Sequence, residues 1–519
     1  MRQPEVPKRN SPKPDAEAER RSVERSMRLS LWDGGFYGLM TGITQNILAP
    51  FALLLNASNF LISLLTTLPH LAGSAFQLLA ASTLKLFTSS KRYLVLMLAL
   101  QTLSIALIPV TLLVHTASGH LALVLLLAFV TTTATFSLMA NPVWMSYIGD
   151  LVPERKRNSF FGTRTAVIAA ATFLTTILAG LLLKGMAEHA IVAFVILYGL
   201  AALFRLVSTL CVAKSRDHAV PKMGGKVKLR EFLARVQTDD FGRFVTFTVL
   251  VRFGSYIAAP FFVVYELNVL QLDYLTFMLL QAASVVTSFL TMRAWAWLAD
   301  HRGSRRVLVY STLLIATIPL LWIVAYFYGL TNAHWPVFLV FEMWSGLSWA
   351  GFNLATSSYM LEASTPADRT KLVSYYNLFN NSAIFIAGLA GAAILKLYPG
   401  AAQVAEAFII LFAVSAVFRF AAWLFARPRL RELRYVEVPV ERRSNTFVLS
   451  ILPREGVVPA YFTHPTPPDI KQGVELRFEK RHELDQLREQ LTGGDMVQRM
   501  KPRERDLYTK KFVERTKKK

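Results

Sequence analysis

Four ionisable residues of the long apolar stretches could do chemistry: Arg252 and Glu342 lie deep within two of them, and Asp33 and Arg164 lie near the ends of two others. Charged side chains are costly inside a bilayer, and where they occur they usually form ion pairs or mark functional sites. We expect Asp33 and Arg164 to form an ion pair that acts as an inner gate. Arg252 and Glu342 either pair, for function or as a permanent salt bridge, or act separately, with Glu342 titrating and Arg252 contacting an anion.

Polar side chains also recur every three or four residues along several of the apolar stretches. Residues with this spacing share one face of a helix, so each set predicts one polar face. Hydrogen bonding between helices is the alternative explanation, above all for the small Ser and Thr residues. The further candidate binding residues on these faces are Tyr37, Gln45, Asn141, Trp144, Trp349, Asn353, Tyr376 and Asn380.

The composition identifies the elements that must position these residues. Of 519 residues, 53% are hydrophobic and 17% are charged, which excludes a disordered chain and makes a soluble enzyme a poor fit. Crossing about 30 Å of hydrocarbon takes roughly 20 apolar residues in a helix. Twelve such stretches predict an all-α polytopic membrane protein, with helices at 31–55, 60–83, 93–114, 120–147, 161–183, 189–213, 241–266, 272–298, 306–329, 335–360, 372–396 and 402–426.

The formal charge of +22 has two common explanations, nucleic-acid binding and cationic loops on one side of a membrane. Eighteen basic residues lie in the connections on the N-terminal side of the predicted membrane, and two lie on the other side. This bias predicts a multi-pass protein of the plasma or inner membrane with both termini in the cytoplasm. We therefore expect contacts with anionic lipid headgroups and none with nucleic acid.

The predicted helices divide into two similar halves. The longest connection, 214–240, is basic and separates a half at 31–213 from a half at 241–426, with terminal segments at 1–30 and 427–519. Tyr147 lies 212 residues before Tyr359, and Lys91 lies 214 residues before Arg305. Such a repeat predicts a pseudo-two-fold axis along the membrane normal, with a central cavity between the halves.

Twelve spans with a central loop, together with two short motifs, resemble the major facilitator superfamily. One motif is the segment 298–306, in which Asp300 and Gly303 precede Arg305 and Arg306. The earlier copy, between the second and third spans, lacks the Asp and Gly. The second motif, 150–157, begins at Asp150 and ends at Arg157, and a related segment follows at 365–369.

This resemblance implies a gating role for both motifs and a cavity lined by the first, fourth, seventh and tenth helices. Asp300 is expected to cap the fifth helix near Asn158 and Ser159, where unpaired N–H groups carry partial positive charge. Arg305 and Arg306 are expected either to contact carboxylates or lipid phosphate or only to hold the orientation of the chain in the membrane, as a short basic loop does. Arg205 and Arg419, near the cytoplasmic ends of their helices, are interpreted as anchors to the headgroups.

The combined evidence predicts a monomeric secondary active transporter of a small solute, working by alternating access and coupled to protons. A lipid translocator on the same fold and a non-transporting receptor or scaffold are the alternatives. We expect no enzyme activity, cofactor or metal site, because the sequence has no phosphate-binding loop and a single cysteine, Cys211. In the basic C-terminal tail, the alternation in 434–451 predicts two short strands and 475–491 predicts a helix, a small α/β-like segment.

Overall fold

The computed structural model describes residues 14–217, 229–363, 369–397 and 404–433, without the side chains of residues 14–20, 81, 149–150, 154–159, 235, 237–238, 369–371 and 404. The predicted strands at 434–451 and the helix at 475–491 lie outside the described residues. Within them the chain is helical and contains no strand. The N-terminal half consists of α1 (Pro14–Leu54), α2 (Asn59–Gln77), α3 (Ala80–Leu84), α4 (Ser90–Leu107), α5 (Val110–His115), α6 (Gly119–Leu151), α7 (Glu154–Gly185), η1 (Ala187–His189) and α8 (Ala190–Ala213).

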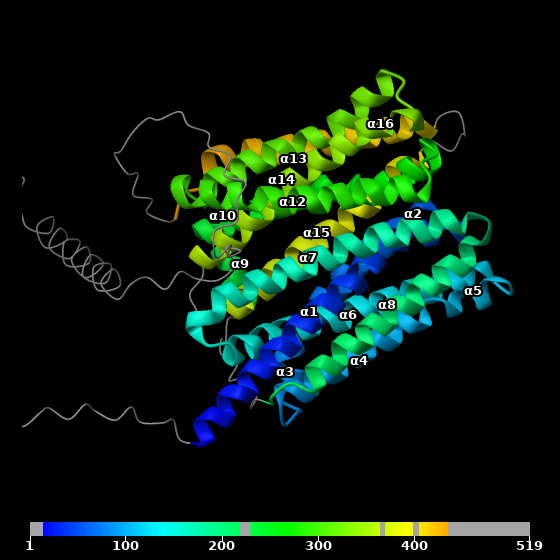
Figure 1. The fold of residues 1–519 in the computed structure, drawn as a ribbon. Helices are drawn as coiled ribbons and strands as arrows, with labels where there is room; N and C mark the ends of the chain where they lie inside the picture. Colours follow the sequence, from blue (N-terminus) through cyan, green and yellow to red (C-terminus); the bar gives the residue numbers. More distant parts are fainter. Residues whose placement is uncertain (1–13, 218–228, 364–368, 398–403, 434–519) are drawn as a thin grey trace, which may run out of the picture. The chain divides into compact units, whose positions relative to one another are not determined.

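The C-terminal half follows with a similar order of long helices (Figure 1). One short helix, α9, precedes it in the central connection. The elements are α9 (Leu229–Thr238), α10 (Asp240–Tyr256), α11 (Ala259–Val264), the π-helical turn η2 (Tyr265–Val269), α12 (Tyr274–Arg302), α13 (Ser304–Phe327), η3 (Asn332–His334), α14 (Trp335–Glu362), α15 (Arg369–Lys396) and α16 (Val404–Arg429).

Helices occupy the predicted spans, although three spans are interrupted. Among the described residues, nine helical segments are long and apolar enough to cross a membrane, while α1, α2 and α14 cover the three more polar predicted spans. The interruptions separate α2 from α3, α4 from α5, and α10 from α11 and η2. Two of them coincide with Pro109 and Pro260, because proline lacks the N–H that continues a helix. The chain is a multi-pass membrane protein.

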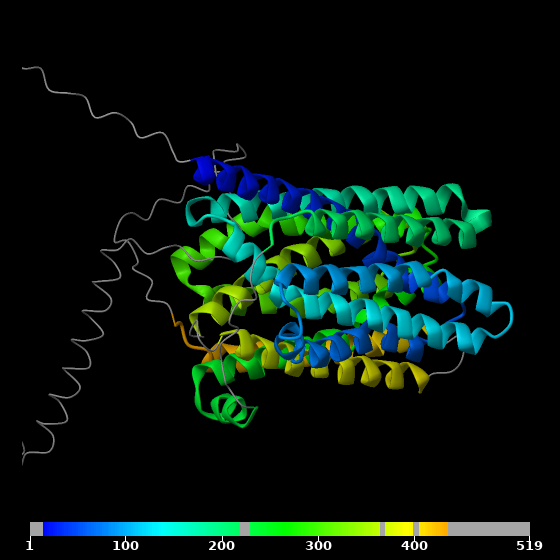
Figure 2. The same ribbon diagram turned by 90° about the horizontal axis from the view of Figure 1, so that it is seen from below.

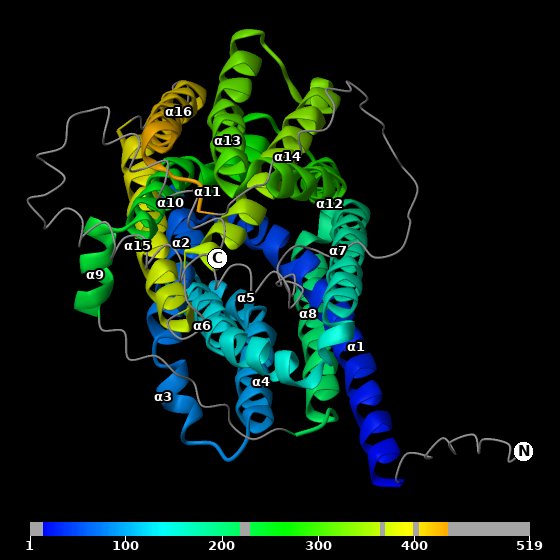
Figure 3. The same cartoon turned by 90° about the vertical axis from the view of Figure 1, so that its left-hand side faces the viewer.

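The two halves meet along two helix pairs (Figures 1 and 2). Helix α2 packs against α15, and α7 packs against α12; the end-on view in Figure 3 shows these pairs on opposite sides of the bundle. At the first contact, a Cβ on Gly388 would lie 2.7 Å from Ser63 Oγ. At the second, a Cβ on Gly180 would lie 2.8 Å from the Met278 side chain. Glycine therefore permits the close approach at both contacts.

The glycine-rich first helix, α1, packs closely against α7. A Cβ on Gly38 would lie 2.6 Å from Ile168 O, and one on Gly42 would clash with Thr172 O. The hydroxyl of Thr172 uses this proximity to donate a hydrogen bond to Gly38 O at 3.1 Å. Small residues and interhelical hydrogen bonds together hold α1 and α7 in one unit.

The repeated tyrosines make equivalent contacts in the two halves. The Tyr147 hydroxyl, on α6, donates to the carbonyl of Arg216, just beyond the end of α8. The Tyr359 hydroxyl, on α14, donates to the carbonyl of Arg431 at 2.8 Å, just beyond the end of α16. In each half, therefore, the fourth long helix fixes the chain that leaves the last one.

The repeated basic residues add to the same contact. Lys91 Nζ donates to the carbonyl of Ser215 at 3.3 Å, and Arg305 Nε donates to the carbonyl of Leu430 at 2.6 Å. Carbonyls at a helix C-terminus lack intrahelical partners and carry partial negative charge, so cationic side chains stabilise them. The shared spacing of the two halves thus corresponds to a repeated structural contact at the predicted cytoplasmic side.

Asp273 caps α12 on the opposite side of the predicted membrane. Its carboxylate accepts hydrogen bonds from Leu275 N and from Thr276 N and Oγ1. Partial burial opposes ionisation, but these bonds and the charge of Lys184 outweigh it and lower the pKa of the carboxyl. The ionised cap therefore stabilises the fold above the unfolded-state pKa, about 3.9, and this contribution is lost as the pH falls through the lower folded-state pKa.

We expect Asp273→Ala to reduce stability by about 0.5–2 kcal/mol at pH 6, which is the usual effect of removing an N-cap. The difference from wild type, measured as the thermal midpoint of the detergent-solubilised protein, should narrow as the pH falls below about 4. Asp273→Asn is the control, because asparagine caps a helix without titrating. A difference that stays constant through acid pH would contradict the capping role.

Candidate functional site

A cavity of about 280 Å³ lies between the two halves. The N-terminal half contributes Gln45 and Asn46 from α1 and Thr66 from α2. The C-terminal half contributes side chains from α10 to α14 and from α16, which include two carboxyl groups and one guanidinium. The position between the halves agrees with the central cavity that the repeat predicts.

The two carboxyl groups of the cavity are Glu342 and Glu266. The depth of Glu342 in an apolar stretch predicts a functional role for it. Glu266 is absent from the sequence-based candidates, because it stands at the very end of the predicted seventh span, where charged residues are common. The sequence feature that could have identified Glu266 is its position as a carboxylate at the end of a long apolar stretch.

The structure places Glu266 in the π-helical turn η2, where its side chain is only 1% exposed. Both of its carboxylate oxygens are buried without a hydrogen-bond partner in the part of the chain that the structure describes. It lines the same cavity as Glu342. Neither carboxylate has an ion-pair partner among the residues that the structure describes. A buried carboxylate in this situation is costly, so its retention points to a ligand or a proton.

Arg419 is the guanidinium at the edge of this cavity, and the prediction that it anchors α16 to the headgroups is wrong. The side chain is 2% exposed and points into the C-terminal half. It donates to the carbonyls of Ile315 and Ser255 at 3.0 and 3.3 Å, and to Ser415 Oγ at 3.0 Å. It therefore ties α16 to α13 and α10 without using a carboxylate.

Arg205 occupies the position in α8 that corresponds to Arg419, 214 residues earlier. It too is buried, at 4% exposure, so the anchor prediction is wrong here as well. Its guanidinium donates to Gln101 Oε1 and, at 3.1 Å, to Ser208 Oγ. Both arginines face the interior because neighbouring helices supply acceptors there, which the sequence of one helix does not reveal.

Asp33 and Arg164 form the expected ion pair, at 2.9 Å between Oδ2 and Nη2. The other carboxylate oxygen of Asp33 accepts from Ser208 Oγ at 2.7 Å. Arg164 also lies over the ring of Trp144, 4.1 Å from its centroid. Both partners of the ion pair belong to the N-terminal half, on α1 and α7, so the pair joins helices within one half. Its role as a gate stays a prediction.

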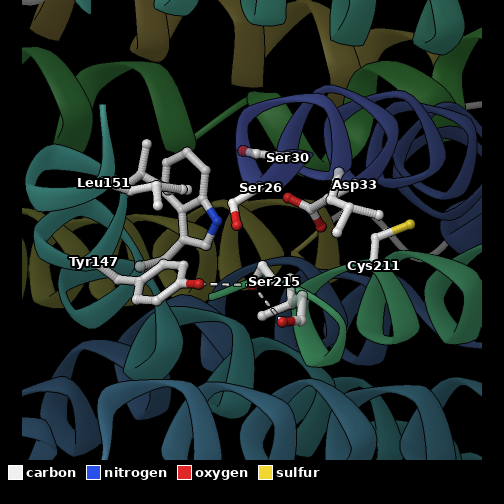
Figure 4. Close-up of a pocket in the computed structure, with 11 residues that line it drawn as sticks. Ser26, Ser30, Asp33, Tyr147, Leu151, Cys211 and Ser215 are labelled. Atoms are coloured by element: carbon white, nitrogen blue, oxygen red, sulfur yellow. Dashed lines mark hydrogen bonds between the residues drawn. The ribbon is translucent and has the colours of Figure 1, made fainter. Parts of the chain in front are cut away.

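Asp33 also lines a small pocket of about 10 Å³, close to the space of a single water molecule. Figure 4 shows this pocket, with Asp33 and Cys211 on one side and Tyr147 bonded to Ser215 on the other. The pocket is too small for a solute. The larger cavity between the halves is therefore the candidate binding site.

Arg252 does not pair with Glu342 in this structure. Its guanidinium lies 3.3 Å from Asn353 Oδ1 and 5.0 Å from the centroid of the Trp349 ring. Asn353 lies eleven residues beyond Glu342 on the same helix, which corresponds to roughly 16 Å along its axis. The alternative in which the two charges act separately therefore fits the geometry.

Tyr376 and Asn380 do not line the cavity, contrary to the prediction that they bind substrate. Tyr376 is 9% exposed and stacks on Phe244, and the Asn380 amide donates to the carbonyl of Tyr376 within α15. Both side chains belong to the packed interior of the C-terminal half.

The remaining candidates take different positions. Gln45 and Trp349 line the cavity as expected. The guanidinium carbon of Arg205 lies 5.2 Å from the centroid of the Tyr37 ring. Tyr37 therefore contacts the charged side chains buried in the N-terminal half. Asn141 is exposed on α6, at the repeat position that corresponds to Asn353.

The predicted gating loop folds against the end of α16. Gly303 has a φ of +86°, and a Cβ on it would clash with the Glu432 carboxylate, so only glycine fits this turn. The backbone N–H of Arg305 donates to Glu432 Oε2 at 3.0 Å. The Arg305 side chain donates to the carbonyls of Leu430 and Arg427 at the end of α16. Among the described residues these carbonyls, and not a carboxylate, are its partners, which corrects the expectation. Arg306 is exposed, as a lipid contact requires.

Three gating predictions stay untested. The expected cap by Asp300 involves Asn158 and Ser159, whose side chains lie outside the described residues. The same holds for the side chains of Asp150 and Arg157, and for the related segment 365–368.

Comparison with known proteins shows which family this chain resembles. The sequence profile of the Major Facilitator Superfamily matches residues 244–465. No curated protein sequence matches the chain. This match over 244–465 confirms the resemblance to the major facilitator superfamily, and the helices of the chain are those of a multi-pass membrane protein.

Solved structures show the same fold over most of the chain. A bacterial homologue of the iron transporter ferroportin, in an inward-facing state, has a TM-score of 0.62 at 16% identity, covering 79% of this chain and 99% of that one. A D-xylose–proton symporter has a TM-score of 0.61 at 13% identity, covering 79% and 98%. The nucleoside transporter NupG has a TM-score of 0.55 at 12% identity, covering 78% and 98%. At these identities the likeness concerns the fold alone.

Proposed function

We propose that the protein is a secondary active transporter that moves a small solute across the membrane by alternating access, coupled to protons. The observation that carries this proposal is the cavity between the halves, which both halves line and which contains two carboxyl groups without ion-pair partners among the described residues. A solute or proton that binds the inward- and outward-facing states with different affinity biases the equilibrium between them.

The arrangement of the helices supports alternating access. The halves touch along α2–α15 and α7–α12, where Gly388 and Gly180 allow the helices to approach closely. The break between α10 and α11, at Pro260, lies beside the cavity. Bending of the chain at this break would therefore move residues that line the cavity. Glu342 is the proposed proton-binding group, and its half-buried side chain lines the cavity.

We also propose the location that the charge bias predicts: the cell membrane, with both termini in the cytoplasm, a monomeric state and anionic lipid headgroups beside the basic loops. The domain boundaries predicted from the sequence belong to the same proposal. A proton-coupled function is consistent with the fold of the D-xylose–proton symporter, although that similarity by itself concerns the fold.

The test is proton flux in proteoliposomes that contain a pH-sensitive dye. Solutes from several classes are added singly, and at least one should drive a proton flux that requires the protein. At a solute concentration high enough to saturate the variant, Glu342→Gln should retain solute exchange and reduce the coupled proton flux at least about tenfold, because the amide has the shape of the carboxyl but does not titrate. Glu406→Gln, at an exposed position in α16, is the control. A proton flux that Glu342→Gln leaves unchanged would contradict the proposal that Glu342 binds the coupled proton.

A further inference from the structure

We propose that Glu266 and Glu342 form a binding site for a small protonated amine, whose N–H groups fill the unpaired carboxylate oxygens and whose apolar part packs against the aromatic wall of the cavity. This inference rests on the proposed function and names its substrate class. Three features of the cavity support it: its unsatisfied acceptors, its charge and its aromatic lining.

The acceptors are the most specific feature. Both carboxylate oxygens of Glu266 are buried and receive no hydrogen bond from any described residue, although the side chain is 1% exposed and lines the cavity. Buried polar groups in proteins are nearly always hydrogen-bonded, and leaving one unsatisfied is costly. A ligand with several N–H donors supplies the missing bonds, and a hydrogen bond between charged groups is about twice as strong as a neutral one.

The charge of the cavity selects the sign of the ligand. With both glutamates ionised, the lining carries two negative charges and the single positive charge of Arg419. The guanidinium of Arg419 is satisfied by carbonyls and a hydroxyl, so it neutralises neither glutamate directly. One monovalent cation therefore balances the site, whereas an anion would meet two carboxylates.

The lining favours an organic cation over a metal ion. The wall includes Trp322 and Trp349 together with two phenylalanines, Phe262 and Phe277. Aromatic faces attract ammonium groups and also bury an apolar body. A volume of about 280 Å³ suits a small molecule of this kind. Among the described residues no group of three or more metal-binding side chains occurs, so carboxylate clusters of the usual metal-binding size are not formed here.

The experiment measures binding to the full-length protein in lipid nanodiscs by calorimetry, with three probes of similar shape. Benzylamine carries a charge and N–H donors, benzyltrimethylammonium carries the charge alone, and benzyl alcohol is neutral. We expect benzylamine to bind most tightly and benzyl alcohol to bind at least about tenfold more weakly, since hydrogen bonds to a charged group contribute roughly 1.5–3 kcal/mol. Equal binding of benzylamine and benzyltrimethylammonium would overturn the hydrogen-bonding role of Glu266.

Variants then locate the site. Glu266→Gln and Glu342→Gln should each weaken benzylamine binding roughly ten- to a hundredfold, and Trp349→Leu should weaken it roughly three- to tenfold. Glu406→Gln changes the same residue type at an exposed position and should have no effect. If Glu266→Gln does not fold, Glu342→Gln and Trp349→Leu carry the test. Unchanged binding in both of these variants would overturn the proposal.

Three further outcomes bear on this inference, and the last two separate it from the proposed function. Tight, glutamate-dependent binding of Na⁺ or Mn²⁺ with no binding of benzylamine would identify an inorganic cation site and overturn the amine proposal. Proton-coupled transport of some solute without amine binding would leave the transporter proposal intact and refute this one. Amine binding to a protein that moves no solute would support this site and refute transport.

Discussion

Asp33→Asn is expected to be the most destabilising single substitution considered for this protein, with a loss of about 3–5 kcal/mol. The Asp33 carboxylate bonds to Arg164 and, through Ser208, is linked to Arg205. The Asp33 and Arg164 side chains are only 5% and 12% exposed. Removing the carboxylate charge leaves two guanidinium groups in the same interior without an acid, which is far more costly than losing the pair as a whole.

The measurement is the thermal midpoint and the yield of monodisperse protein in mild detergent. Asp240→Asn is a matched control, because Asp240 pairs at 2.7 Å with Arg243 at a site where both side chains are at least 30% exposed. Exposed pairs contribute about 0–1 kcal/mol, so this control should hardly change the midpoint. The double variant Asp33→Asn with Arg164→Gln should recover part of the loss. A loss for Asp33→Asn no larger than that of the control would show that the buried pair is not stabilising.

Glu266→Met is expected to have the opposite effect on stability while removing function. The methionine fills a similar volume and removes two buried oxygens that have no partner among residues 14–217, 229–363, 369–397 and 404–433. Because an unsatisfied buried polar group costs about 1–3 kcal/mol, the variant should be more stable than wild type by an amount of that order. The same variant should lose benzylamine binding and solute-dependent proton flux, so stability rises as function is lost.

Thermal midpoints, amine binding and proton flux are measured on the same preparation of Glu266→Met. The control is Glu406→Met, which replaces an exposed glutamate and should change neither stability nor binding. A lower midpoint for Glu266→Met would mean that its carboxylate stabilises the fold, which is incompatible with an unpaired group retained for a ligand.

Much of the fold follows from local sequence patterns. Apolar stretches of sufficient length predict the helices, because a chain in lipid must satisfy its own backbone hydrogen bonds. Even so, the breaks beside Pro109 and Pro260 divide spans that are continuous in the sequence pattern. The repeat is visible in the spacing of Tyr147 and Tyr359, and the structure adds the contacts those residues make.

The candidate site is only partly predictable. Glu342 and the pair of Asp33 with Arg164 can be recognised because a charge inside an apolar stretch is costly wherever the stretch packs. Tyr376 shows the limit of helical periodicity, since the spacing correctly groups it with Asn380 on one face but does not reveal that this face packs against Phe244.

The sequence by itself determined that this is a helical membrane protein of two related halves, because hydropathy, charge bias and repeat spacing are properties of the chain alone. Only the tertiary structure decided which charges share the cavity. Glu266, Glu342 and Arg419 come from three separate helical elements, and their meeting depends on helix packing between segments up to 153 residues apart. That packing also turned Arg419 inward, towards carbonyl acceptors on α10 and α13.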